Sequence, residues 1–416
     1  MHIKAGALFL ILVTLSLLAL FGTVAAQSPE TLRVALYPYV PKGRELFFKL
    51  EAAFEAAHPG VNVELVESKP LLEDYYKDGL LKADADIYEI DTVLLPDMIR
   101  AGKIAPLTLP NADFVPEARQ AVQFNGSTWA VPHWICGNFL FYAKGDEAVK
   151  KAKTWEELVA AFGANTAWFV DLKGTSTLGE WYLTVIAGLD GDAASVLNRL
   201  QSSSLDPAAI QKLQALLGPC PAGYCRSRAL HDRTGYYARQ FARGRARAYI
   251  GYSETLHYAL QEIADNCGVT DGCRRADEIA VRALPVLLPQ GKPVGWVDGL
   301  GISAALTGRK KDLAREFIEF AASWQAYQLI LNTETGTAPR YLLPALRLST
   351  RNPELDPPLY KTLYAAFGMR LILTAEGLNK ALRDRGEALD CVLPPERGDA
   401  KWAQRCQNVS SPSPRQ

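Results

Sequence analysis

The sequence predicts an α/β protein of two domains, from two observations. Strand patterns and helix patterns alternate in the first hundred residues, which is typical of a parallel sheet covered by helices. The chain has 416 residues, of which 49% are hydrophobic. Because domains usually contain about 100 to 200 residues, this length and composition are enough for two hydrophobic cores.

The chain begins with an expected signal peptide, residues 1–26. Lys4 supplies a positive start, residues 5–24 are almost wholly apolar, and small residues up to Ala26 suit cleavage before Gln27. An uncleaved membrane anchor is the alternative, because the apolar run is nearly long enough to span a bilayer. The small residues and the polar stretch after them favour cleavage, which predicts a secreted or periplasmic protein without a membrane partner.

The expected first domain begins with clear alternations of strand and helix. Its predicted strands are 31–39, 61–66 and 86–91, and its predicted helices are 44–58 and 93–101. Ligands of parallel α/β sheets bind at the carboxyl ends of the strands. Tyr37, Tyr39 and Asp91 lie at such ends, so they are candidate ligand-binding residues.

The segment 128–142 leads into a second region. We expect strands at 246–251, 279–285 and 297–304, and helices at 154–162, 179–187, 208–217, 234–243 and 311–322, the last continuing to 331. Lys plus Arg and Asp plus Glu number 45 each, so the charge balance does not favour a nucleic-acid partner.

This layout resembles that of exported solute-binding proteins. The resemblance implies a periplasmic-binding-protein-like (type II) fold, in which two α/β lobes enclose a ligand cleft. We expect lobe I to comprise 29–134 and 298–345, lobe II to comprise 135–297 and 346–407, and a polar tail to follow at 408–416.

Seven cysteines divide into three close pairs and one unpaired residue, Cys136. Because exported proteins form disulfides, we predict the bonds Cys220–Cys225, Cys267–Cys273 and Cys391–Cys406. A buried, inert Cys136 is one interpretation, since free cysteine often packs as a small hydrophobe. Its position at the lobe crossing, followed by Gly137, favours a place beside the ligand instead.

A nucleophilic cysteine must be a thiolate, and it needs a base to lose its proton. His133 is a poor partner, because strand residues three apart point to opposite faces. Glu254 is the candidate base, since it follows directly on a predicted strand. The alternative is that Glu254 only stabilises the first turn of the next helix.

Several segments together resemble the thiamine pyridinylase (thiaminase I) family. They are the opening strand around Tyr37 and Tyr39, the segment ending at Asp91, the block Trp129 to Tyr142 around Cys136, and the segments Gly251-Tyr252-Ser253-Glu254 and Val297-Asp298-Gly299. The resemblance implies a base-exchange transferase acting on thiamine. Cys136 would attack C6 of the pyrimidine, Glu254 would take the thiol proton, and an amine or thiol co-substrate would replace the thiazole.

The resemblance also implies the residues that bind the substrate. Asp91 and Asp298 would hold the protonated pyrimidine, and Tyr37, Tyr39, Tyr76 and Tyr252 would form aromatic walls that attract the thiazolium cation. Trp134 and Trp296 depart from the family pattern at positions that should line the cleft.

We expect no metal, no cofactor and a monomeric protein. A non-catalytic binding protein for thiamine or a related pyrimidine is the main alternative, and a cysteine hydrolase of another heterocycle is a third.

Overall fold

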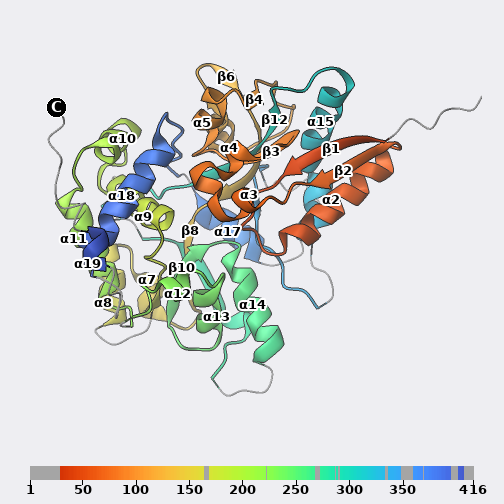
Figure 1. Ribbon diagram of the computed structural model, residues 1–416. Coiled ribbons are helices and arrows are strands. Elements are labelled where there is room, and N and C mark those ends of the chain that lie inside the picture. The colour runs from red at the N-terminus through yellow and green to blue at the C-terminus, as the bar shows by residue number, and fades with distance from the viewer. Residues whose placement is uncertain are drawn as a thin grey trace, which may run out of the picture.

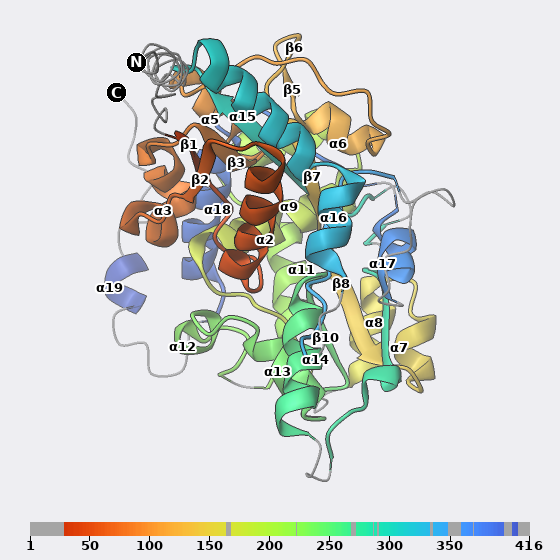
Figure 2. The same cartoon turned by 90° about the vertical axis from the view of Figure 1, so that its right-hand side faces the viewer.

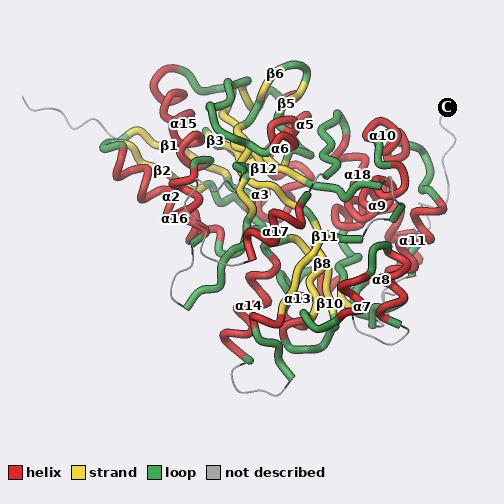
Figure 3. The backbone as a smooth tube through the Cα atoms, turned by 180° about the vertical axis from the view of Figure 1, so that it is seen from behind, coloured by secondary structure: helices red, strands yellow, loops and turns green. Residues whose placement is uncertain are grey.

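A computed structural model describes residues 29–163, 168–221, 223–267, 272–285, 287–288, 291–332, 336–347, 359–368, 370–394 and 402–406. The expected signal peptide and polar tail lie outside these residues. Two main sheets organise this part of the chain, one of seven strands and one of four, with helices around both (Figures 1 and 3). None of the described helices is long and apolar enough to span a bilayer.

The larger sheet contains β1 (Glu30–Ala35), β2 (Val61–Leu65), β3 (Ile87–Asp91), β4 (Ile104–Ala105), β7 (Val131–Cys136), β12 (Trp296–Ser303) and β13 (Leu343–Pro344). Its order is β13-β7-β12-β3-β1-β2, with β4 beside β12. β1 is parallel to β2 and β3, as predicted, but β12 is antiparallel to β3 and β7. The parallel arrangement expected for the first strands is thus confirmed, whereas β12, which returns from the other sheet, runs in the opposite direction to β3 and β7.

Helices pack on both faces of this sheet. They are α2 (Gly43–Ala57), α3 (Lys69–Asp74), a π-helix (Tyr75–Gly79), α4 (Leu80–Lys82), α5 (Leu95–Arg100), α6 (Pro116–Ala121), α15 (Gly308–Ala321) and α16 (Trp324–Leu331). Figure 2 shows α2, α15 and α16 together in front of the sheet, and Phe54 of α2 packs on Phe317 of α15 with ring centroids 5.1 Å apart. The single helix expected to run to residue 331 is two helices, because Ser323 caps α16 by accepting from Ala326 N at 3.2 Å.

The smaller sheet has the order β11-β8-β10-β9. Its strands are β8 (Asn138–Ala143), β9 (Trp168–Phe169), β10 (Ala248–Tyr252) and β11 (Ile279–Ala283), and a separate hairpin joins β5 (Gln123–Phe124) to β6 (Ser127–Thr128). The helices around it are α7 (Glu147–Lys151), α8 (Trp155–Phe162), α9 (Thr175–Asp190), α10 (Ala193–Gln201), α11 (Pro207–Leu217), α12 (Arg228–His231), α13 (Tyr236–Ala242), α14 (Thr255–Asn266), a 3₁₀ turn (Ala276–Glu278), α17 (Leu359–Phe367), α18 (Leu378–Val392) and α19 (Trp402–Cys406).

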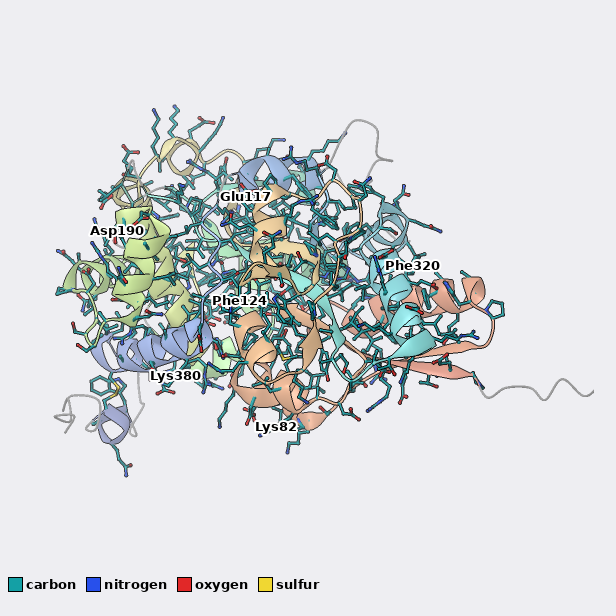
Figure 4. The ribbon with its side chains drawn as sticks, turned by 90° about the horizontal axis from the view of Figure 1, so that it is seen from above. Lys82, Glu117, Phe124, Asp190, Phe320 and Lys380 are labelled. Carbon is teal, nitrogen blue, oxygen red and sulfur yellow. A yellow bond between two sulfur atoms is a disulfide. The ribbon has the colours of Figure 1, made fainter. Side chains whose placement is uncertain are left out.

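Two glycines let α9 and α18 pack unusually closely. A Cβ on Gly179 would lie 2.1 Å from the carbonyl oxygen of Leu382, and a Cβ on Gly386 would lie 1.8 Å from that of Thr175. Figure 4 labels Asp190 at the end of α9 and Lys380 on α18 on the same side of the molecule, opposite Phe320 of α15. Helix α9 is thereby held in place along its first two turns.

The three predicted disulfides are confirmed: Cys220–Cys225, Cys267–Cys273 and Cys391–Cys406. The last one ties α19 to α18. Cys136 is the free cysteine.

A single residue, Gly137, separates the two sheets along the chain. β7 of the larger sheet ends at Cys136, and β8 of the smaller sheet begins at Asn138. A side chain at Gly137 would collide with Arg370, since a Cβ there would lie 2.6 Å from Nη1. A larger residue at this position would therefore displace the buried Arg370 guanidinium.

Candidate active site

Cys136 lies at the carboxyl end of β7, where that strand meets the start of β12. The residue is partly exposed, and its thiol donates a hydrogen bond to Oδ2 of Asp298 at 3.5 Å. Cys136 thus packs where the two core clusters meet, and its hydrogen-bond partner is a carboxyl group.

Asp298 and a second carboxylic acid, Asp91, lie opposite each other on two neighbouring strands of the larger sheet. Asp298 is the register partner of Asp91, on β3, and both side chains are buried. Burial raises the pKa of Asp91 to about 6, although Val93 N and the Tyr76 hydroxyl donate to it at 3.1 and 2.8 Å. Burial and the negative charge of Asp91 raise the pKa of Asp298 well above its usual value. Of the two, Asp298 therefore holds a proton more readily, and Asp91 ionises first as pH rises.

Tyrosines stand beside Asp91 on the same lobe. The hydroxyls of Tyr37 and Tyr76 lie 2.9 Å apart, so Tyr37, Tyr76 and Asp91 form one chain of hydrogen bonds. Tyr39, which is 46% exposed, stacks on Tyr76 with ring centroids 6.4 Å apart. Tyr75 is buried and binds the backbone of β3. The π-helix thus directs Tyr76, rather than its neighbour Tyr75, towards the carboxylates.

The smaller sheet contributes Glu254, which follows β10 and caps α14. Burial raises the pKa of Glu254 to about 7, against a weak hydrogen bond from Ser253 at 3.3 Å. The negative charge of Glu254 also contributes to the raised pKa of the Cys136 thiol. A carboxylate with a pKa near neutrality is suited to accept a proton.

The acidic surroundings keep Cys136 protonated in the free protein. Burial raises the pKa of the Cys136 thiol well above its usual value, and the negative charges of Asp298, Glu254 and Asp91 raise it further. A thiolate here needs a compensating positive charge.

The buried guanidinium of Arg370, next to Gly137, supplies such a charge. The Arg370 guanidinium donates to the carbonyl oxygens of Phe367, Val294 and Asn138 at 2.9, 2.9 and 3.2 Å. Burial lowers the pKa of Arg370 to about 10, while the nearby Tyr252 and Cys136 raise it. None of the described carboxylates pairs with Arg370, so its charge is available to stabilise an anion at Cys136.

The fold agrees with the comparisons to known proteins. The family model for bacterial extracellular solute-binding proteins matches residues 49–341. The chain belongs to this family. Thiaminase-1 of Paenibacillus thiaminolyticus is 25% identical over 355 residues, which cover 81% of each chain.

Solved structures give the same picture of the fold. Thiaminase I from Bacillus thiaminolyticus matches with a TM-score of 0.73 at 22% identity, over 88% of this chain and 100% of that one. Clostridium botulinum thiaminase I in complex with thiamin matches with a TM-score of 0.72 at 22% identity, over 86% and 98%. The predicted resemblance to thiaminase I and the predicted two-lobed binding-protein fold are confirmed.

Two tryptophans, Trp134 and Trp296, were expected to line the cleft, and their surroundings in the structure differ. Trp134 is 1% exposed, its indole donates to Glu89 Oε1 at 2.8 Å, and its ring packs against His133 and Tyr327. Glu89 thus holds the indole in the core, and a contact between Trp134 and the substrate stays a prediction. Trp296 is the register partner of Cys136 and lines a pocket together with Asn138, Thr184 and Arg370.

The sequence analysis missed three residues around this site. Glu89 accepts hydrogen bonds from His133, Trp134 and the backbone N–H of Tyr37, and so anchors the tyrosine chain. Arg370 and Glu180 belong to segments distant in sequence, which gave no local signal. Glu89 had one available signal, a charged residue inside the apolar strand 86–91.

No metal centre is recognisable in the described part of the chain, since no three His, Cys, Asp or Glu side chains are grouped to hold an ion.

Proposed function

We propose that the protein is a thiamine pyridinylase, a transferase that exchanges the thiazole of thiamine for an amine or thiol. The Cys136 thiolate attacks C6 of the pyrimidine and Glu254 takes the thiol proton. The thiazole then leaves the methylene carbon, and the co-substrate takes its place. The observation that carries the proposal is the free thiol of Cys136, which is hydrogen-bonded to Asp298 in a site where both lobes supply carboxylates.

The charges of the site suit a cationic substrate. Thiamine has a positive thiazolium ring, and its aminopyrimidine becomes more electrophilic at C6 when a ring nitrogen is protonated. Two neighbouring buried carboxyl groups with raised pKa values, of which Asp91 ionises first, favour a protonated ring beside them. The bound cation also offsets the carboxylates that hold the thiol protonated, so substrate binding promotes ionisation of Cys136.

Aromatic rings complete the proposed substrate site. The faces of Tyr37, Tyr39 and Tyr76 lie within 6.4 Å of one another, measured between centroids, and can contact the thiazolium. Tyr252 approaches from the other lobe, and Trp296 lies beside Cys136 on the adjacent strand.

The proposal is tested by incubating the protein with thiamine and aniline. We expect loss of thiamine absorbance and a pyrimidinylmethyl-aniline product by mass spectrometry. Cys136→Ser should abolish turnover and retain thiamine binding, whereas a Cys391→Ser/Cys406→Ser variant should retain turnover. Near-normal rates for Cys136→Ser would refute the nucleophile.

A non-catalytic binding protein is the second candidate, and membership of the solute-binding family favours it. Tight binding of thiamine that stays intact in the presence of aniline would support this function over the transferase. A product containing only the pyrimidine alcohol would instead indicate a hydrolase.

We further propose that the protein is exported, cleaved after Ala26 and monomeric. The mature N-terminus by mass spectrometry and the mass in solution by light scattering test these points.

A further inference from the structure

Glu180 is an acidic residue near the site that has no role in the steps above. It lies in the second turn of α9, next to Gly179, where contact with α18 fixes the helix. Its Oε2 accepts a hydrogen bond from the hydroxyl of Tyr252 at 2.5 Å. Tyr252 ends β10, two residues before Glu254, so one strand end connects both glutamates.

Acidic groups associated with both sheets act on Glu180 electrostatically. Burial raises the pKa of Glu180 to about 7, and the negative charges of Asp91, Asp171 and Glu254 add to this, while the Tyr252 hydroxyl opposes it. No lysine or arginine of the described residues pairs with Glu180, and its second oxygen, Oε1, has no hydrogen-bond partner among them. Glu180 therefore has an oxygen free to bind a ligand proton, at a pKa suited to proton transfer.

The proposed reaction needs a second base. When the thiazole has left, Glu254 holds the proton that it took from Cys136, and it keeps that proton until the thiolate is released. An incoming amine or thiol must also lose a proton as it bonds to the methylene carbon. Glu254 cannot accept it at that stage.

We propose that Glu180 is the catalytic base for the incoming nucleophile and that Tyr252 orients it. The inference rests on the proposed transferase function. The nitrogen lone pair of an amine forms a bond to the methylene carbon, and its N–H proton passes to Glu180 Oε1. The electrons of the exocyclic double bond return to the pyrimidine ring, the C6–S bond breaks, and the Cys136 thiolate recovers its proton from Glu254.

Two nucleophiles separate this role from a structural one. Aniline must lose an N–H proton, whereas pyridine has none to lose, so only aniline needs the base. Since a general base typically contributes about 10² to 10⁴ in rate, we expect Glu180→Gln to lower the ratio of the aniline rate to the pyridine rate at least ~100-fold. Tyr252→Phe should lower the same ratio by a smaller factor, because Glu180 is retained but no longer oriented.

The intact mass of the protein supplies an independent measurement. With thiamine and aniline, Glu180→Gln should accumulate the pyrimidinylmethyl adduct on Cys136, because the first half of the reaction is intact. An unchanged ratio, or an equal loss with both nucleophiles and no adduct, would overturn the role of Glu180. Absence of thiamine cleavage by the unmodified protein with either nucleophile would instead overturn the proposed function itself.

Discussion

Asp91→Asn should change how the stability of the protein depends on pH. Asp91 has a pKa of about 6 in the folded protein against 3.8 as its ordinary value. Folding therefore takes up a proton between these values, and the stability it provides is complete below the lower pKa and lost as pH rises through the higher one. At 1.36 kcal/mol per pKa unit, the full effect is about 3 kcal/mol, of which about 2 kcal/mol is lost between pH 4.5 and 7.5.

The substitution removes this loss, because asparagine does not titrate. It also removes the negative charge that helps to raise the pKa of Asp298, which reduces the pH dependence further. Urea denaturation at pH 4.5 and 7.5 measures the effect as the difference between the two unfolding free energies. Asp312→Asn, at an exposed position of α15, is the matched control and should leave that difference unchanged.

The reasoning would be refuted if Asp91→Asn kept the pH dependence of the unmodified protein. Asp91 would then carry no raised pKa, and the picture of a proton-sharing pair with Asp298 would fail. A control variant that reproduced the effect of Asp91→Asn would point to a general loss of negative charge instead.

Three further predictions concern the surroundings of the site. Arg370→Met should raise the pKa of the Cys136 thiol, so that alkylation by iodoacetamide in the free protein slows at pH 9 and its midpoint moves to higher pH; an unmoved midpoint would exclude electrostatic support from Arg370. Glu89→Gln should cost about 1–3 kcal/mol in urea denaturation, because one of the three N–H donors that meet its carboxylate loses its acceptor. Removing the Cys391–Cys406 disulfide, which spans 15 residues, should lower the free energy of unfolding by up to about 3 kcal/mol in urea denaturation. A thiol count on the denatured, unmodified protein tests the pairing itself, and a count above one would contradict it.

The periodicity of apolar residues predicted many of the helices and strands, because it depends only on residues that are close in sequence. The helix expected at 44–58 is α2, and the strands expected at 61–66 and 279–285 begin where β2 and β11 begin. The antiparallel direction of β12 was not predictable in this way, since it depends on which sheet the chain returns from. The packing of α18 on α9 was not predicted either, because the contact between Gly179 and Leu382 joins segments about 200 residues apart in the chain.

The candidate site likewise contains residues that were predicted from the sequence and residues that were not. Cys136 and Asp298 were found from sequence, and the structure brings them into hydrogen-bond contact. The hydrogen bond from the Trp134 indole to Glu89 was not predictable, because nothing near Trp134 in the chain indicates it. Glu180 and Arg370 act on Cys136 and its neighbours from helices and loops far away in sequence, so only the folded chain reveals them.

The one-residue crossing at Gly137 has a mechanical consequence. A point next to a pivot travels little when one body turns on another, and distant points travel far. If the lobes swing about this junction, the sulfur of Cys136 stays almost stationary, while elements far from the junction move through a wide arc. Substrate would then be delivered to a fixed nucleophile.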